Sequence, residues 1–436
     1  MNIAVKVDAA ESAKADADAT PLAELNPAKI ERFQNDTMWP YFARLRREDP
    51  VHFTAESEFG PYWSITKWDD IMAVDTHHQA FSSTSGIVLS TLEARERMRR
   101  ELGERTPEER REAARRGEDV SFIGLDEPHH APKRKAVSPT LAPANIAEMA
   151  PLVRERAGQI LDGLPIGEEF DWVDLVSKEL TSMTLATMLD FPFEQRRKLL
   201  YWTSGRNADG SEMAWEERQR ATQERRAAFD DLWAQKFDAE PGIDMISMMA
   251  HNPATRHMSR EEYQGNVVLL IIGGNDTTRN TISGSVYELN RNRDQYDKLR
   301  ADHDLIPAMV SETIRWQTPL AHMARTALAD TEVGGKVIRE GDRVAMWYIS
   351  GNRDESVIDN PDTYDILRAR PRHHMSFGFG VHRCVGNRVA EMQLTIIWEE
   401  ILKRFPEITV VGEPIRSNSN FFHGFETLPV VIPARA

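Results

Sequence analysis

The segment SFGFGVHRCVGNR (376–388) contains Cys384, the only cysteine among the 436 residues of the chain. The thiol stands in a glycine-rich loop, directly before a segment whose apolar residues recur at helical spacing. Free N–H groups at the start of a helix, together with the neighbouring His382 and Arg383, favour a thiolate. A thiolate can act as a nucleophile or as a metal ligand, whereas a lone cysteine in an apolar setting is simply a small core residue.

Two chemical interpretations of Cys384 differ in the neighbours that they require. A nucleophilic thiolate needs a histidine base within hydrogen-bond reach, and His382 could serve. A thiolate that ligates haem iron needs a close, glycine-lined approach with aromatic contact. Phe377 and Phe379 suit the second role better.

A second unusual segment is QGNVVLLIIGGNDTTRNTISGSVYELNRN (264–292), which has the pattern of one long helix. Gly273 and Gly274 interrupt its apolar face, and each interior glycine costs about 1 kcal/mol relative to alanine. Asp276 and Thr277 follow directly. Residues that disfavour a helix in mid-helix indicate one of two features. One is a functional site, and the other is a close helix crossing at which Thr277 hydrogen-bonds to its own backbone.

Two charged pairs have the spacing of one helical face. Glu312 and Arg315 in SETIRW are three residues apart, and His130 and Arg134 in DEPHHAPKRKAVSP are four apart. Taken alone, the first pair would be a surface ion pair of little energetic value. The second, taken alone, would be the basic end of a solvent-facing helix.

The four segments together resemble the cytochrome P-450 family of haem-thiolate monooxygenases, and they occur in the order typical of that family. The segment Phe377-Gly378-x-Gly380-x-His382-x-Cys384-x-Gly386 resembles the family's haem-ligand signature. The resemblance implies that the cofactor is haem b, that Cys384 is the iron ligand and that Phe377 and Gly386 help to bind the haem. It covers the chain from about residue 38 to the C-terminus and implies a single domain.

The resemblance also assigns roles to the other segments. Thr277 is expected to hydrogen-bond dioxygen at the iron, and Asp276 to help relay protons. Glu312 and Arg315 are expected to be a buried structural pair that holds a downstream loop. The haem propionates are expected to contact a set of basic residues, namely His130, Arg134, Arg325 and His382.

The sequences of these segments are similar to those of the soluble bacterial P-450 group, whose members hydroxylate alkanes and fatty acids at the terminal carbon. This resemblance predicts an apolar funnel that presents only a methyl group to the reactive centre. The expected substrate-contacting residues are Leu269, Ile272, Gly273, Leu320, Ser419 and Phe422. A terpenoid, steroid or polyketide substrate is the main alternative, and a peroxygenase or a haem-based sensor is disfavoured because Asp276 and Thr277 are present and no output domain is visible.

Electrons must come from another protein, because the sequence has no visible flavin-binding segment and a single cysteine cannot hold an iron–sulfur cluster. We expect a ferredoxin with an NAD(P)H-dependent reductase. The predicted docking set is basic and comprises Lys133, Arg134, Lys135, Arg383 and Arg388, of which Arg134 is expected to face the haem instead. The net charge of −15 argues against nucleic-acid binding.

The elements that must position these residues are mostly helices. Amphipathic patterns fill most of 38–320, and strand patterns occur at 51–55, 62–66, 325–330, 336–349 and 428–433. The expected fold is therefore mainly α with small β-sheets, with one monooxygenase domain over 26–436. Residues 1–25 are expected to be a disordered or loosely attached tail. No apolar run approaches the length of a membrane span, so a cytoplasmic protein is expected.

Overall fold

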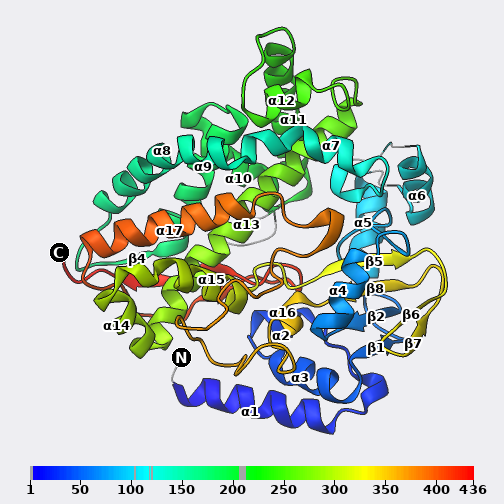
Figure 1. Ribbon diagram of the computed structural model, residues 1–436, viewed down its shortest axis with the longest axis horizontal. Helices are drawn as coiled ribbons and strands as arrows, with labels where there is room; N and C mark the ends of the chain where they lie inside the picture. The colour runs from blue at the N-terminus through cyan, green and yellow to red at the C-terminus, as the bar shows by residue number, and fades with distance from the viewer. Residues whose placement is uncertain (1–2, 103–104, 117, 119–120, 206–212) are drawn as a thin grey trace.

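The computed structural model describes residues 3–102, 105–116, 118, 121–205 and 213–436, and most of them are helical (Figure 1). No helix in these ranges is long and apolar enough to cross a bilayer. The helices are α1 (Ile3–Ala19), α2 (Ile30–Gln34), α3 (Trp39–Glu48), α4 (Trp68–Thr76), α5 (Leu92–Leu102), α6 (Pro107–Arg115), α7 (His130–Val137), α8 (Pro143–Asp162), α9 (Lys178–Leu189), α10 (Arg196–Ser204), α11 (Trp215–Phe237), α12 (Met245–His251), α13 (Arg260–Arg291), α14 (Arg293–Ala301), α15 (Ile306–Gln317), α16 (Tyr348–Gly351) and α17 (Asn387–Arg404).

Short strands form small sheets beside this helical body. The largest sheet has the order β1-β2-β8-β5-β3, with β2 and β8 parallel and the other neighbours antiparallel. A second sheet has the order β4-β12-β9, and β10-β11 and β6-β7 are two-stranded. The strands are β1 (Val51–Thr54), β2 (Tyr62–Ile65), β3 (Phe81–Ser82), β4 (Glu169–Asp171), β5 (Met323–Ala327), β6 (Thr331–Val333), β7 (Lys336–Ile338), β8 (Arg343–Met346), β9 (Thr409–Val410), β10 (Ile415–Arg416), β11 (Phe425–Thr427) and β12 (Pro429–Val431). The expectation of a mainly α fold with small sheets is confirmed.

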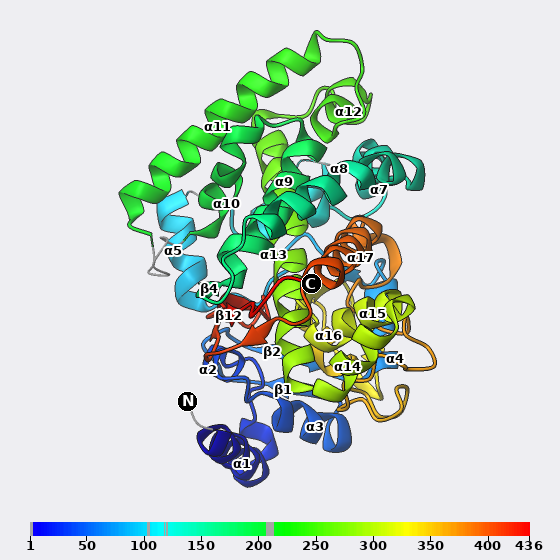
Figure 2. The ribbon, with the colours of Figure 1, turned by 90° about the vertical axis from the view of Figure 1, so that its left-hand side faces the viewer.

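Helix α13 runs through the middle of the molecule and contacts many of the other helices (Figure 2). Its 32 residues span roughly 48 Å at 1.5 Å per residue. The helix begins after Ser259, whose side chain accepts a hydrogen bond from the backbone N–H of Glu262 at 3.1 Å. It ends before Asn292. The helix predicted over 264–292 is therefore present and starts four residues earlier.

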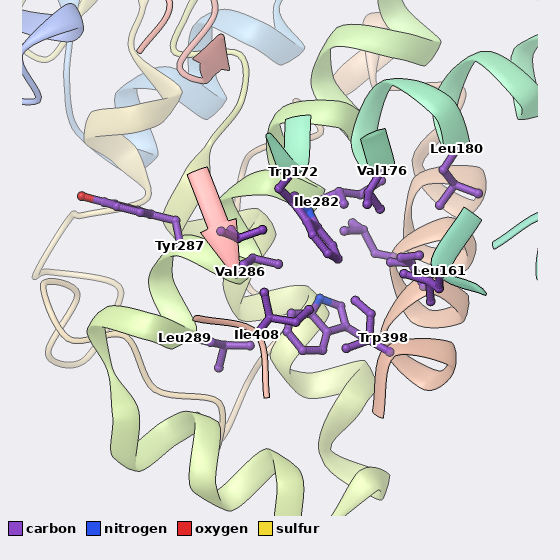
Figure 3. Packing of buried hydrophobic residues seen from close by; sticks show 14 of the residues in the cluster. Leu161, Trp172, Val176, Leu180, Ile282, Val286, Tyr287, Leu289, Trp398 and Ile408 are labelled. Atoms are coloured by element: carbon purple, nitrogen blue, oxygen red, sulfur yellow. The ribbon is translucent and has the colours of Figure 1, made fainter. Parts of the chain in front are cut away.

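The main hydrophobic core lies where α13 packs with α8, α9, α15 and α17 (Figure 3). Ile282 and Val286 on α13 meet Trp398 on α17, and the indole Nε1 of Trp398 donates to Ser285 Oγ at 2.8 Å. A buried indole N–H needs such a partner. This core holds α13 and α17 in fixed positions, and both helices carry residues of the predicted site.

The N-terminal segment differs from the expected loose tail. Residues 3–19 form α1, and its last turn is attached to α3, because Ala17 and Leu25 are buried in one cluster with Tyr41 and Leu45. The Tyr41 hydroxyl donates to Asp16 at 2.5 Å. An alanine-rich composition suits a helix, and these few contacts give it something to pack against. Residues 1 and 2 lie outside the described part of the chain.

Candidate active site

A large cavity lies between α13, α17, the five-stranded sheet and the helices α5, α10 and α11. Its volume is about 1720 Å³, above the roughly 300–1,000 Å³ of an ordinary ligand pocket. Most of the predicted site residues line it: His130, Arg134, Leu269, Ile272, Gly273, Thr277, Leu320, Arg325, Phe377, His382, Cys384, Gly386 and Phe422. Asp276, Glu312, Arg315 and Ser419 are outside the lining.

Cys384 lies at one end of this cavity, in the loop before α17. Its thiol is open to the cavity although protein surrounds the loop. The Cys384 backbone N–H donates to the Phe377 carbonyl at 2.8 Å, which closes the loop. Burial raises the pKa of the thiol, and the N–H groups of Gly386 and Asn387 and the charges of Arg134 and Arg383 only partly oppose this. The predicted low-pKa thiol is therefore wrong for the cysteine alone, but a coordinated metal deprotonates a thiol outright.

The glycines of the loop have two different roles. Gly378 and Gly380 adopt φ of 63°, in the left-handed region that glycine favours. A Cβ on Gly380 would lie 2.7 Å from the backbone oxygen of Asp75 at the end of α4. A Cβ on Gly386 would meet nothing within 4 Å. We predicted that the loop glycines let the backbone come close to a cofactor. This is incomplete, because Gly380 instead lets the loop pack closely against α4.

Basic residues beside the loop have unsatisfied buried atoms. The rings of His130 and His382 lie 4.2 Å apart between centroids, and Nε2 of His130 and Nδ1 of His382 are buried without a hydrogen-bond partner in the described structure. His382 Nε2 contacts Ser83 Oγ at 3.1 Å. Burial, the largest cause, and neighbouring charges such as Arg325 together lower the pKa of His382 to about 2. Two unpartnered imidazole nitrogens on the cavity wall fit a group that carries carboxylates.

Two arginines add positive charge to the same wall. Arg325 on β5 donates to Asp75 at 3.0 Å, and Arg134 on α7 donates to the carbonyl of Arg383 at 2.5 Å. Burial lowers the pKa of Arg134, while the neighbouring Cys384 thiolate raises it. Together the thiol, the imidazoles and the guanidinium groups fit haem, which has an iron atom for the sulfur and two propionates for the basic residues.

Asp276 and Thr277 occupy mid-helix positions of α13. Thr277 lines the cavity, and its hydroxyl donates to the carbonyl of Gly273 at 2.9 Å, the local back-bond that mid-helix threonines can form. Asp276 is outside the lining, accepts a hydrogen bond from the Asn275 side chain at 2.9 Å and forms an ion pair with Arg279 at 3.1 Å. Burial raises the pKa of Asp276, and the charge of Arg279 opposes that rise. A carboxyl with a raised pKa one residue from a cavity-facing hydroxyl can hold or pass on a proton.

Glu312 and Arg315 form a buried structural pair, not a surface one. Both side chains are fully buried, and Arg315 donates to Glu312 at 2.7 and 2.8 Å. Arg315 also donates to the carbonyls of Asn352 and Pro361, while Arg368 donates to Glu312 at 3.1 Å. These bonds join α15 to the loop that leads into the cysteine segment.

Ser419 acts on the cavity indirectly. Its hydroxyl accepts from the backbone N–H groups of Phe421 and Phe422, each at 3.0 Å. Phe422 forms an isolated β-bridge with Leu320, so both apolar residues are fixed on the cavity wall. Ser419 itself is outside the cavity lining, and a direct contact between Ser419 and substrate stays a prediction.

The predicted docking set also needs correction. Lys133 pairs with Glu262 of α13 at 2.5 Å, and the exposed fractions of the two side chains are only 13% and 8%. Arg134 faces the cavity, as described above. Lys135, Arg383 and Arg388 remain exposed near the cysteine loop. An electron-donor surface here would consist of these three residues.

One structurally important residue lies outside every motif that the sequence suggested. Asp75, at the end of α4, accepts hydrogen bonds from Arg325, the Tyr348 hydroxyl and the backbone N–H of Phe379. It joins α4, β5 and the cysteine loop at one point. An aspartate in a short amphipathic helix gives no sequence signal for such a role, because its three partners are far away in the chain.

Comparisons with known proteins agree with this site. A family model described as Cytochrome P450 matches residues 167–425. Linalool 8-monooxygenase of Pseudomonas putida is 34% identical over 395 residues, which are 90% of this chain and 94% of that protein. Methyl-branched lipid omega-hydroxylase of Mycobacterium tuberculosis (strain H37Rv) is 29% identical, covering 94% and 95%. The structure of cytochrome P450-153 from Novosphingobium aromaticivorans superposes with a TM-score of 0.82 at 39% identity, covering 94% and 99%.

The fold and the thiol-based cavity thus define a haem-thiolate enzyme, and the chain belongs to the cytochrome P450 family. It is a monooxygenase whose cofactor is haem b, and such enzymes use dioxygen, a redox partner and apolar substrates. Bound haem supplies the chemistry that activates dioxygen. The residues that would hold it are Cys384 at the iron and His130, Arg134, Arg325 and His382 at the propionates.

Proposed function

We propose that this enzyme hydroxylates the terminal carbon of medium-chain alkanes or fatty acids. The observation that carries the proposal is the shape and lining of the cavity. It is lined from Cys384 past α13 to Trp202 on α10 and Met213 before α11, so an extended chain has room to lie along it. The expected affinity rises by about 0.8 kcal/mol for each buried methylene.

Selectivity for the chain end has to come from geometry. A terminal methyl C–H bond is stronger than a methylene C–H bond, so a free chain would react at the methylenes first. Leu269 and Ile272 on α13 line the cavity, as do Leu320 and Phe422, and these apolar side chains can restrict the approach to one end of a chain. Gly273 leaves open space beside them, because a Cβ there would meet nothing within 4 Å. That space is where the reacting methyl group would lie.

The similarity to the methyl-branched lipid omega-hydroxylase supports a terminal position of attack. A second candidate is a terpenoid substrate, and the similarity to linalool 8-monooxygenase supports it. Steroid C26-monooxygenase of Mycobacterium tuberculosis (strain H37Rv) is 31% identical over 318 residues. This similarity supports a steroid, which we group with the terpenoid as the alternative to a linear chain.

The experiment that separates the candidates is a titration of the ferric holoenzyme, followed by the haem absorption band. We expect saturable spectral shifts with octane and with dodecanoic acid, at lower concentrations than with linalool. A saturable shift with linalool alone would favour the terpenoid function. No shift with either linear chain would contradict the proposal.

We also propose that a ferredoxin, reduced by an NAD(P)H-dependent reductase, supplies the electrons. Lys135 on α7 and Arg383 and Arg388 beside the cysteine loop form an exposed basic surface on the thiolate side of the cavity. An acidic ferredoxin could dock there although the whole chain carries a net charge of −15.

A further inference from the structure

The cavity contains a buried arginine to which no described residue supplies a counter-ion. Arg225 lies on α11 and lines the cavity, and only 9% of it is exposed. Its Nε is buried without a hydrogen-bond partner, and no carboxylate of the described residues forms a salt bridge with it. Burial, the largest cause, and the charge of the neighbouring Arg226 together lower the pKa of Arg225 to about 10. No group in the described structure raises it.

Arg225 is exceptional among the buried arginines of the described chain, because each of the others has a carboxylate within reach. These pairs are Arg46–Glu355 at 3.1 Å, Arg315–Glu312 at 2.7 Å, Arg325–Asp75 at 3.0 Å, Arg353–Asp362 at 3.4 Å and Arg416–Asp36 at 2.7 Å. A charge taken out of water without a partner is costly, so buried charges are normally paired. The missing partner of Arg225 therefore has to be explained.

The surrounding charges favour an anion from outside the protein. The cavity lining includes many arginines, among them Arg95, Arg218 and Arg343, whereas its carboxylates within the described residues are Glu96 and Glu261. This excess of positive charge contrasts with the net charge of −15 for the whole chain. A cation-lined cavity with apolar walls attracts and concentrates an anionic, partly apolar ligand.

The position of Arg225 sets a length for that ligand. The next residue, Arg226, accepts a hydrogen bond through its carbonyl from Gln264 of α13 at 3.0 Å. Gln264 and Gly273 both line the cavity and are nine residues apart in sequence, which is roughly 13.5 Å along the helix. An extended chain advances about 3.3–3.6 Å for every three bonds. A chain of about twelve carbons would therefore reach from Arg225 to the open space beside Gly273.

We propose that Arg225 binds the carboxylate head of a fatty acid of about twelve carbons whose methyl end points toward Cys384. This inference rests on the proposed function and narrows it, since it makes fatty acids the preferred substrates and alkanes weaker ones. The planar guanidinium group can donate two parallel hydrogen bonds to a carboxylate. The paired charge would remove the cost of the unpartnered Arg225.

The test compares an acid with an alkane of the same length, dodecanoic acid with dodecane, in titrations of the ferric holoenzyme. Arg225→Gln should raise the Kd of dodecanoic acid at least tenfold and change that of dodecane less than twofold. Arg225→Lys should restore part of the acid affinity, because it keeps the charge but loses the bidentate geometry. The matched control is Arg220→Gln, an exposed arginine of α11 outside the cavity lining, which should change neither Kd.

Three outcomes would overturn the inference. Equal weakening of acid and alkane would mean that Arg225 only shapes the cavity, and unchanged acid binding would mean that the head lies elsewhere. No saturable shift of the wild-type protein with dodecanoic acid would contradict the site directly.

If binding depends on Arg225 but oxidation occurs away from the chain end, the proposed terminal hydroxylation fails and the carboxylate site stands. Thermal unfolding of Arg225→Gln should occur at a temperature no lower than that of the wild type, because the change removes an unpartnered buried charge and the described structure gives Arg225 no hydrogen bond to lose.

Discussion

Gly273 and Gly274 are adjacent residues of α13 with opposite surroundings. A Cβ on Gly273 would meet nothing within 4 Å, whereas a Cβ on Gly274 would lie 2.7 Å from Cδ2 of Leu185 on α9. The first glycine therefore keeps the cavity open, and the second allows α9 and α13 to pack closely. The sequence suggested either a functional site or a helix crossing here, and the structure contains both.

The pair gives a matched test at the residue scale. Gly273→Ala should not lower the melting temperature, because alanine gains about 1 kcal/mol in a helix interior, and it should change the turnover rate or the ratio of terminal to subterminal product. Gly274→Ala should be less stable than Gly273→Ala by about 1–3 kcal/mol, because the extra methyl group forces Leu185 to move. Product analysis and thermal unfolding of both variants measure this. An unchanged rate and product ratio in Gly273→Ala would remove Gly273 from the site.

Asp276 is the residue that we expect to hold or relay a proton. Asp276→Asn keeps the size of the side chain but cannot release a proton, so product formation should fall by about 100-fold or more while substrate binding is retained. Because burial raises the pKa of Asp276, its carboxyl stays protonated to a higher pH than an exposed aspartate does.

The pH dependence follows from that direction. If Asp276 passes on a proton, the wild-type rate should decrease as pH rises through its raised pKa, and this decrease should be absent in Asp276→Asn. Steady-state rates over a pH series would measure both. A variant with wild-type turnover and an unchanged pH profile would exclude Asp276 from the chemistry.

At the scale of elements, the buried Glu312 joins α15 to the loop before the cysteine segment. Glu312→Gln would leave Arg315 and Arg368 without a buried negative charge, which should cost about 3–5 kcal/mol. The measurement is unfolding of the holoenzyme together with its haem content, and both should decrease. The control is Glu108→Gln on α6. Glu108 pairs with Arg111 at the same spacing of three residues, but its side chain is 83% exposed. The free energy of unfolding of that variant should fall by less than about 1 kcal/mol. An equally small decrease in Glu312→Gln would contradict the structural role of Glu312.

Periodicity in the sequence was sufficient to predict the long elements. α13 and α17 follow their predicted apolar patterns, and the strand patterns at 51–55 and 62–66 correspond to β1 and β2. Contacts between distant segments could not be predicted in this way. Lys133 was assigned to a docking surface because its neighbours in sequence are basic, yet its partner Glu262 lies on α13. Arg225 belongs to no sequence motif, and only the absence of a partner among the described residues distinguishes it.

At the scale of the whole molecule, the cysteine loop lines the cavity and also carries part of the proposed electron-donor surface, because Cys384 lines the cavity and the neighbouring Arg383 is exposed. The double variant Lys135→Glu and Arg388→Glu should slow reduction by ferredoxin at low ionic strength, since both changes oppose an acidic partner. The effect should weaken as salt shortens the Debye length toward about 8 Å at 0.15 M. Stopped-flow reduction at two salt concentrations measures it.

The control for that experiment is Arg220→Glu on α11, which should leave the reduction rate unchanged. Reduction rates of the double variant that equal the wild type at low salt would contradict docking at this surface. Lys133→Glu should instead lower stability, because it places two negative charges together in the partly buried pair with Glu262.

The central claim is that Cys384-bound haem oxidises the end of a linear chain. Its most direct test is turnover of dodecanoic acid and dodecane by the holoenzyme with a ferredoxin, its reductase and NAD(P)H, with the products separated by position. We predict that 12-hydroxydodecanoic acid and 1-dodecanol are the main products. Products hydroxylated mainly at internal carbons, or turnover of linalool but of neither linear chain, would contradict the claim.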